Sequence, residues 1–363
     1  MRTSRNFTRR DSMTLRDAFD PRNNSLNAIR LAMAIGVIFW HSFPLTGRDI
    51  GFEPLRQFVG EVWVDGFFAI SGFLITRSWM RRPDVRAYLS ARLVRIVPAF
   101  YVCLVVTALV VAPIGVLSQG GNAWSLLTSS APIRYVLENL GIWTFGYDVG
   151  GTPTGVPYPG VWNGSLWTLG WEVLCYLAVM VLGVIGALKR GWILPTAFIG
   201  MLSILLTWIF VPLPWLITTG ARFAIVFIAG ALIYQYQDRI RCSWPLVATA
   251  VSITVGSMWL DDYRLVGALP WAYAVICIGS LVKHPRLRFE NNDVSYGMYI
   301  YAFPVQQLLV IWFGTLTPAL FWLLATGCTI IPAFASWRLI EKPALAAKKR
   351  RTASKQRDPI AAS

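Results

Sequence analysis

The sequence predicts an all-α fold, a polytopic bundle of about ten helices that cross a membrane. Three observations lead to this fold class. Of the 363 residues, 55% are hydrophobic and only 14% are charged, whereas about 25% of the residues of a typical soluble domain are charged. Apolar runs long enough to cross a bilayer, roughly eighteen residues or more, recur along almost the whole chain. The segments between these runs alternate between basic and nearly uncharged.

The apolar runs divide the chain into predicted spans flanked by two basic tails. The spans cover roughly residues 26–45, 58–77, 96–116, 166–188, 192–211, 217–236, 244–260, 264–282, 295–314 and 318–339. Basic side chains gather in every second connection, and the positive-inside rule places those connections and both termini in the cytosol. We therefore expect a basic cytosolic tail over 1–25, a membrane domain over 26–342 and a basic, disordered cytosolic tail over 343–363.

Two connections are longer than a turn. Residues 78–95 are basic and have helical periodicity, which predicts an interfacial helix on the cytosolic side. Residues 117–165 are rich in Gly, Pro, Trp and Tyr and nearly uncharged. Long loops are often functional, and aromatic and amide groups on the outer side suit contact with sugars. The alternative interpretation is an aromatic belt at the membrane interface.

Composition and missing motifs argue against several other classes. The formal net charge of +15 does not indicate a nucleic-acid partner, because the basic residues lie between apolar runs, as membrane orientation requires. The five cysteines lie mostly inside apolar runs, and no CxxC pair is present. We therefore predict neither a metal site nor disulfides. Because the sequence lacks a Walker loop and a GxGxxG after a strand, we predict no soluble nucleotide-binding domain.

The first span carries two ionisable side chains on one face. Arg30 lies near its start and His41 near its end, and the step of eleven positions from one to the other corresponds to about three helical turns, roughly 16 Å along the axis. Ionisable side chains at membrane depth are costly and usually face a protein interior or a wet cavity. This helix is therefore expected to place a cation near the inner surface and an imidazole near the outer one.

Helix rise places three further ionisable residues at the depth of His41. Asp65, Glu172 and Arg222 each lie about two turns inward from the outer surface on separate spans. An imidazole with a carboxylate partner is the minimum apparatus for general-base activation of a hydroxyl. The sequence does not decide which carboxylate serves His41. For Asp65, Glu172 and Arg222, the alternative interpretation is a buried ion pair that only joins two helices. The other histidine, His284, falls in a basic cytosolic connection.

Four arginines gather near the opposite, cytosolic ends of the first three spans. They are Arg30, Arg77, Arg92 and Arg95. Arg92 and Arg95 are three residues apart and share a helix face. Guanidinium groups suit bidentate capture of phosphates. The alternative is a basic anchor that meets anionic lipid.

Five short motifs follow one another on the expected membrane sides. They are Arg30 and His41 with ten residues between them, Asp65-Gly-Phe-Phe-Ala-Ile-Ser-Gly-Phe-Leu-Ile, Arg92-x-x-Arg95 followed by Pro98, Ser165-Leu-Trp-Thr-Leu-x-x-Glu172, and Asp293-Val-Ser-Tyr-Gly-Met-Tyr-Ile. In these motifs the chain resembles the membrane-bound acyltransferase family 3 over most of residues 26–345. It departs from the family at Ala302, where many members have a histidine, and this departure leaves the sugar specificity open.

The resemblance implies an enzyme of the O-acetyltransferase type in the bacterial inner membrane. Such an enzyme moves an acyl group, commonly acetyl from acetyl-CoA, to a hydroxyl of a cell-surface polysaccharide or a lipid-linked saccharide. Membrane lipids are the remaining partner, and no metal is implied. Carried over by motif, Arg92 and Arg95 would hold the phosphates of acyl-CoA, with Arg30 and Arg77 beside them.

The resemblance places the chemistry in the outer layer. It implies that His41 is the general base or a transient acyl acceptor, oriented by Asp65 or Glu172. The side chains expected to contact the acceptor are Ser71, Trp167, Arg222 and Tyr299. The main alternative function is a transporter that exports a saccharide or small metabolite, since ten spans and a polar layer also suit transport. The sequence shows no matched halves of the kind that many transporters have.

Overall fold

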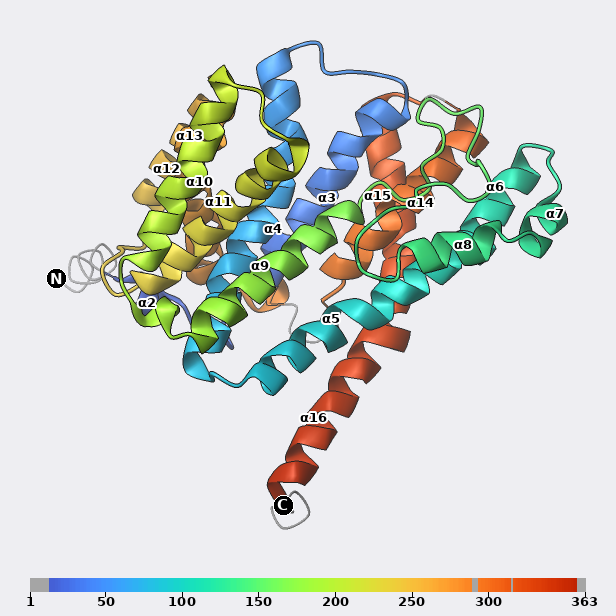
Figure 1. Cartoon of the computed structure of the whole chain (residues 1–363). Helices are drawn as coiled ribbons and strands as arrows, with labels where there is room; N and C mark the ends of the chain where they lie inside the picture. The colour runs from blue at the N-terminus through green and yellow to red at the C-terminus, as the bar shows by residue number, and fades with distance from the viewer. Residues whose placement is uncertain (1–12, 289–292, 315, 358–363) are drawn as a thin grey trace. The chain divides into compact units, whose positions relative to one another are not determined.

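The computed structural model describes residues 13–288, 293–314 and 316–357, with side chains described up to residue 350. The regular elements of these residues are helices (Figure 1), so the predicted all-α class is confirmed. The chain divides into two units. The first unit comprises Met1–Val37, Asp49–Val85 and Trp171–Asn291, and the second comprises Ile38–Arg48, Arg86–Gly170 and Asn292–Ser363.

A helix occupies each range predicted to be a span. These helices are α3 (Leu26–Leu45), α4 (Glu53–Arg81), α5 (Val85–Val106), α9 (Trp167–Val184), α10 (Ile193–Phe210), α11 (Trp215–Gln235), α12 (Trp244–Gly256), α13 (Arg264–Leu281), α14 (Ser295–Phe313) and α15 (Pro318–Ser336). Within the described residues, 8 helices, counted with their direct continuations, are long and apolar enough to cross a membrane. The other two helices do not meet this criterion. α12 is too short, and the glutamines and tyrosines of α14 lower its mean hydropathy. The helices are those of a membrane protein, while the count of ten spans and the cytosolic termini stay predictions.

The first unit is organised around the contact between α4 and α11, against both of which α13 packs. Two glycines allow the close approach of these helices. A Cβ on Gly72 would collide with the carbonyl oxygen of Phe227, and a Cβ on Gly230 would collide with that of Ala69. Small residues let helix backbones meet in this way in membranes. The pair forms a firm support for the polar side chains of both helices.

The second unit is organised around α14, most of whose side chains are buried. α14 packs against α15, against the π-helical turn η1 (Thr107–Val111) and against α6 (Ala112–Ser118), which together continue α5. The long connection over 117–165, which the sequence predicts on the outer side and which we call the outer connection, contains two short helices, α7 (Ala123–Thr128) and α8 (Ala131–Glu138), and α8 packs on η1. The central position of α14 allows its side chains to reach several neighbouring elements at once.

The basic segment 78–95 differs from its prediction. Its first residues are the end of α4, which runs to Arg81, and its last residues are the beginning of α5, which starts at Val85. Pro83 lies between the two helices and disfavours a helical conformation at the residue before it. The segment is therefore not a separate interfacial helix.

The C-terminal tail, for which the sequence predicted no regular structure, is helical as far as the structure describes it. α15 continues through the π-helical turn η5 (Trp337–Glu341) into α16 (Lys342–Arg357), as Figure 1 shows. Ala, Lys and Arg dominate α16, and all three are strong helix formers. At the other end of the chain, α2 (Leu15–Ala18) buries Leu15 and Ala18, while residues 1–12 lie outside the description.

Candidate functional site

α3 is one continuous helix through both Arg30 and His41, as the sequence predicted. Its residues up to Val37 belong to the first unit and those from Ile38 onwards belong to the second. The surroundings of Arg30 are therefore described with the first unit, together with Asp65, Glu172 and Arg222. Those of His41 are described with the second.

The His41 imidazole packs against an aromatic ring and keeps one nitrogen unpartnered. The Phe303 ring of α14 meets it edge to face, with ring centroids 5.0 Å apart. His41 is partly exposed, yet its Nδ1 atom is buried and has no hydrogen-bond partner among the described residues. A buried imidazole nitrogen normally finds a donor or an acceptor. None of the described residues uses the hydrogen-bonding capacity of this nitrogen.

A buried amide clamps the helical turn that carries His41. Gln306 of α14 donates from Nε2 to the Ile38 carbonyl oxygen at 3.0 Å and to the Ser42 hydroxyl at 3.2 Å. The Ser42 hydroxyl itself donates to the Ile38 carbonyl oxygen at 2.7 Å. Gln306 is fully buried, and its Oε1 atom has no partner in the described part of the chain. These bonds fix the turn of α3 on which the imidazole is mounted.

Gln307, the residue after Gln306, joins the outer connection to α14. Gln307 donates from Nε2 to the carbonyl oxygens of Tyr158 at 2.8 Å and Val161 at 2.7 Å. The Tyr158 ring lies 6.0 Å from the Phe303 ring, centroid to centroid, and Phe303 in turn contacts His41. The outer connection therefore reaches the aromatic side of the histidine.

The segment before α9 is pinned to α14 by a second set of hydrogen bonds. Asn163 donates to the Ile300 carbonyl oxygen at 2.8 Å, and the Tyr299 hydroxyl donates to the Ser165 carbonyl oxygen at 2.9 Å. The Tyr299 hydroxyl also lies 2.5 Å from that of Thr168. Tyr299 thus joins two elements, and its expected contact with an acceptor stays a prediction, as does that of the half-buried Trp167.

In the first unit, Asp65 belongs to a network of charged side chains. Its Oδ2 atom lies 2.7 Å from Nε of Arg264 and accepts a hydrogen bond from the Tyr263 hydroxyl. Glu61, one turn earlier on α4, pairs with both Arg222 and Arg264.

Asp262 completes the network and also contacts both arginines. Its carboxylate lies 3.3 Å from Arg222 and 3.2 Å from Arg264. The predicted residues Asp65 and Arg222 therefore share one cluster, in which three carboxylates meet two guanidinium groups.

Glu172 has different partners from Asp65. Its Oε1 atom accepts hydrogen bonds from the Ser71 hydroxyl at 2.8 Å and from the Tyr176 hydroxyl. Arg30 lies near enough to the Tyr176 hydroxyl to interact with it electrostatically. No described Lys or Arg forms an ion pair with Glu172. The structure thus brings together the predicted residues Ser71 and Glu172 and separates them, by partners, from the charged cluster.

The four predicted phosphate-binding arginines have aromatic or acidic neighbours. In the second unit, Arg95 forms an ion pair with Asp293 at 2.7 Å, and Ser295 donates to the same carboxylate at 2.6 Å. The Arg92 guanidinium lies 3.8 Å above the centre of the Tyr88 ring. In the first unit, the Arg77 guanidinium lies 5.3 Å from the centre of the Phe19 ring. A role for the four arginines in holding a donor stays a prediction.

Sequence reasoning did not find several of these residues. Gln306 and Gln307 had a signal, because two adjacent amides are unusual in an apolar span and demand partners. Arg264 and Glu61 had one too, since each is a charge within a predicted span on the outer side. Tyr176 had none, because a tyrosine in a membrane helix is ordinary.

Comparison with known proteins adds three matches. A family model described as an acyltransferase domain matches residues 23–338. An "O-acetyl transferase" of Shigella phage Sf6 is 28% identical over 361 residues, covering 88% of this chain and 96% of that protein. "Nodulation protein 10" of Rhizobium leguminosarum bv. viciae is 26% identical over 357 residues, covering 89% and 93% of the two chains. No solved structure matches the chain.

Proposed function

The chain belongs to the acyltransferase family 3 and is an acyltransferase of the O-acetyltransferase type, and from this premise we propose its substrates. The donor is acetyl-CoA, and the acceptor is a hydroxyl of a cell-surface polysaccharide or of a lipid-linked saccharide. The observation that carries the proposal is the His41 imidazole, which has an unpartnered buried nitrogen on a turn held by Gln306.

In the proposed reaction, His41 is the general base. Its free nitrogen accepts the proton of the acceptor hydroxyl while the hydroxyl oxygen attacks the thioester carbonyl carbon. The tetrahedral intermediate collapses, the carbon–sulfur bond breaks, and the imidazolium returns the proton to the departing CoA sulfur. The products are an acetyl ester and CoA, and the histidine is regenerated.

Several contacts support this role for His41. The amide of Gln306 and the hydroxyl of Ser42 hold the backbone of the turn, and the Phe303 ring restricts the imidazole on one side. Correct placement of a reacting group accounts for much of enzymatic rate enhancement. A base that rests on a clamped turn meets this requirement without any movement of the chain.

The donor's phosphates are assigned to Arg92 and Arg95, with Arg30 and Arg77 as further cations. Asp293 supports this assignment, because it orients the guanidinium of Arg95 while 36% of the Arg95 side chain stays exposed. A guanidinium held by a buried carboxylate presents its remaining edge in a fixed direction, which suits a phosphate.

The acceptor is assigned to the outer side of the membrane, where the long connection carries exposed aromatic residues. Trp124 is 73% exposed and Phe145 is 71% exposed, and such rings can stack on sugar rings. Ser71, Trp167, Arg222 and Tyr299 are the further side chains proposed to contact it. We place the enzyme in a bacterial inner membrane with cytosolic termini, since the basic connections alternate with uncharged ones.

The proposal is tested with labelled acetyl-CoA and inverted membrane vesicles that contain the protein. Label transferred to lipid-linked or lumenal saccharide supports it, provided that His41→Ala vesicles transfer about a thousandfold less. Transfer to a protein or a small metabolite would contradict the acceptor assignment. Saccharide flux that does not need CoA would favour the transporter instead.

A further inference from the structure

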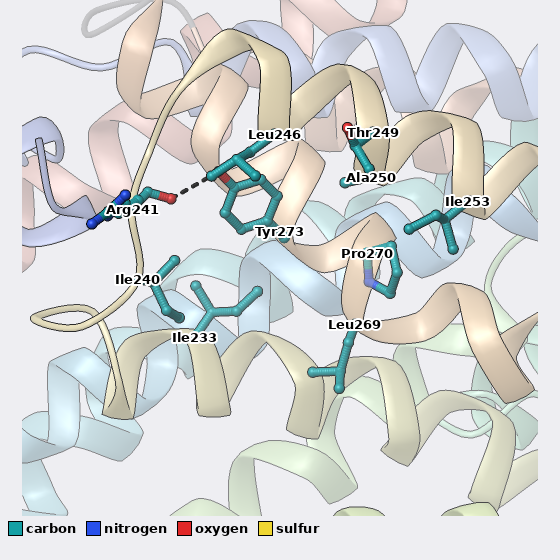
Figure 2. A pocket seen from close by; sticks show the side chains of 10 residues that line it. All are labelled: Ile233, Ile240, Arg241, Leu246, Thr249, Ala250, Ile253, Leu269, Pro270 and Tyr273. Atoms are coloured by element: carbon teal, nitrogen blue, oxygen red, sulfur yellow. Dashed lines mark hydrogen bonds between the residues drawn. The ribbon is translucent and has the colours of Figure 1, made fainter. Parts of the chain in front are cut away.

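The first unit contains an open apolar groove that the acyl transfer chemistry does not use. It has a volume of about 410 Å³ and lies between α12, α13 and the end of α11. Figure 2 shows Leu246, Ala250 and Ile253 of α12 opposite Leu269, Pro270 and Tyr273 of α13. Ten residues line it, and nearly all of the surface is hydrocarbon.

Two residues that line the groove limit how tightly its helices can pack. Pro270 lies inside α13 and has no backbone N–H, so the helix loses one hydrogen bond there. Ala250 of α12 has a small side chain and also lines the groove. The groove passes along α12 from Leu246 to Ile253, two helical turns or roughly 10 Å.

Exposed apolar side chains border the groove, and Arg241 lies at one end of it. Leu246, Ile253 and Leu269 are each about two-fifths exposed, at 44%, 42% and 39%, on helices that lie within the membrane part of the chain. At the Arg241 end, the backbone oxygen of this residue accepts a hydrogen bond from the Tyr273 hydroxyl at 2.8 Å (Figure 2). We expect an occupant to enter the groove across these exposed side chains.

The charge balance at that end favours an anion. The connection between α11 and α12 carries Arg239 and Arg241, which are exposed, and neither forms an ion pair with a described carboxylate. Its one carboxylate, Asp238, is already paired with Arg16 at 2.7 Å. A hydrocarbon groove with Arg241 at one end, and Arg239 two residues away in the same connection, matches one chain and the head group of an anionic phospholipid.

We propose that this groove binds an anionic phospholipid, with an acyl chain between α12 and α13 and the phosphate at Arg241. This lipid site is distinct from the residues proposed for acyl transfer. Juxtamembrane basic residues attract anionic lipid by about 1 kcal/mol each, which corresponds to about a fivefold preference over a zwitterionic lipid.

Photo-crosslinking in vesicles tests the site directly. The full-length protein is placed in phosphatidylcholine vesicles with a trace of phosphatidylglycerol that carries a diazirine on one acyl chain, or with phosphatidylcholine that carries the same chain. We expect cross-links on the peptides of α12 and α13, about fivefold more with phosphatidylglycerol. Equal yields for the two lipids, or cross-links confined to other helices, would overturn the proposal.

Two pairs of variants assign the two ends of the lipid. Arg241→Gln should lower the phosphatidylglycerol yield to that of phosphatidylcholine, whereas Arg190→Gln, an exposed arginine of another connection, should not. Thr249→Phe should lower both yields by filling the groove. Ser203→Phe is its matched control, since both hydroxyls are exposed and both donate to the carbonyl oxygen four residues earlier. A lipid preference that survives Arg241→Gln would refute the assigned head-group position.

Discussion

The two polar regions of the molecule hold their side chains with different kinds of partner. In the first unit, the carboxylates of Glu61, Asp65 and Asp262 each meet a guanidinium of Arg222 or Arg264. Around His41 in the second unit, the partners are neutral amides, hydroxyls and an aromatic ring. There the His41 Nδ1 and the Gln306 Oε1 are buried and have no partner in the described chain.

This difference helps to distinguish polar residues that stabilise the fold from polar residues that take part in the reaction. A buried network of paired charges holds helices together, and the loss of one member is costly. Buried polar atoms that lack partners are costly to keep in a folded protein. The charged cluster has such atoms too, Asp65 Oδ1 among them, but its side chains are held by ion pairs, whereas no described residue forms an ion pair with His41. The charged cluster is the stronger electrostatic feature, yet the uncharged region is the better candidate for the reaction.

The largest expected effect is that of His41→Ala on activity. Removal of a general base typically costs about 10²–10⁴-fold in rate, so we expect a loss of about a thousandfold in acetyl transfer with an unchanged melting temperature. Initial rates with labelled acetyl-CoA provide the measurement. His284→Ala is the control, since His284 is exposed in a connection. Near-normal transfer by His41→Ala would place the chemistry elsewhere.

Arg264→Gln should affect stability instead. It leaves Asp65, which is fully buried, without its guanidinium, and breaking a buried pair in this way costs about 3–5 kcal/mol. We expect a clearly lower melting temperature in detergent. Arg16→Gln breaks the exposed pair with Asp238 and should cost at most about 1 kcal/mol. If the two variants melted alike, the cluster would not be the structural element inferred here.

Gln306→Leu should lower activity by disturbing the position of the His41 imidazole. The variant removes both hydrogen bonds to the turn of α3, and a small misplacement of a reacting group can cost about a hundredfold in rate. We expect kcat to fall about a hundredfold, while KM for acetyl-CoA stays the same. Gln306→Asn, which keeps an amide, should recover part of the rate. A raised KM with an unchanged kcat would argue against a positioning role.

The smallest effects distinguish the two carboxylates proposed to serve His41. In Glu172→Gln the new amide oxygen can still accept from Ser71 and Tyr176, so stability should change by less than about 1 kcal/mol. If the Glu172 charge supports catalysis, the rate should fall about tenfold, or ~1.4 kcal/mol. Asp65→Asn should mainly lower the melting temperature. The reverse pattern, with stability lost in Glu172→Gln and activity lost in Asp65→Asn, would make Asp65 the functional carboxylate.

The fold was largely predictable because apolar runs and basic connections are local signals. Every predicted span contains a helix. The segment 78–95 was misjudged because its basic, periodic pattern resembles an interfacial helix, whereas Pro83 divides it between two longer helices. The tail after Lys342 was misjudged because a polar composition was taken as disorder, although its Ala, Lys and Arg residues propagate a helix from α15.

The candidate site was predictable in its individual residues but not in their partners. Depth counting assigned Asp65, Glu172 and Arg222 to one layer, yet it carries no information on which faces meet. Arg264 was overlooked although it is the first residue of the predicted span 264–282. The hydrogen bonds of Gln306 depend on how α14 packs, and no sequence pattern specifies this.

The pairing of Asp65 has a consequence for biosynthesis. Its partner Tyr263 lies 198 residues further along the chain, and Arg264 follows directly. At roughly 5–20 residues per second, a ribosome needs roughly 10–40 s to make that stretch. During this interval α4 has already been made while its buried carboxylate still lacks a guanidinium. The first unit therefore becomes stable only when α13 arrives, and chains that stop earlier should be short-lived.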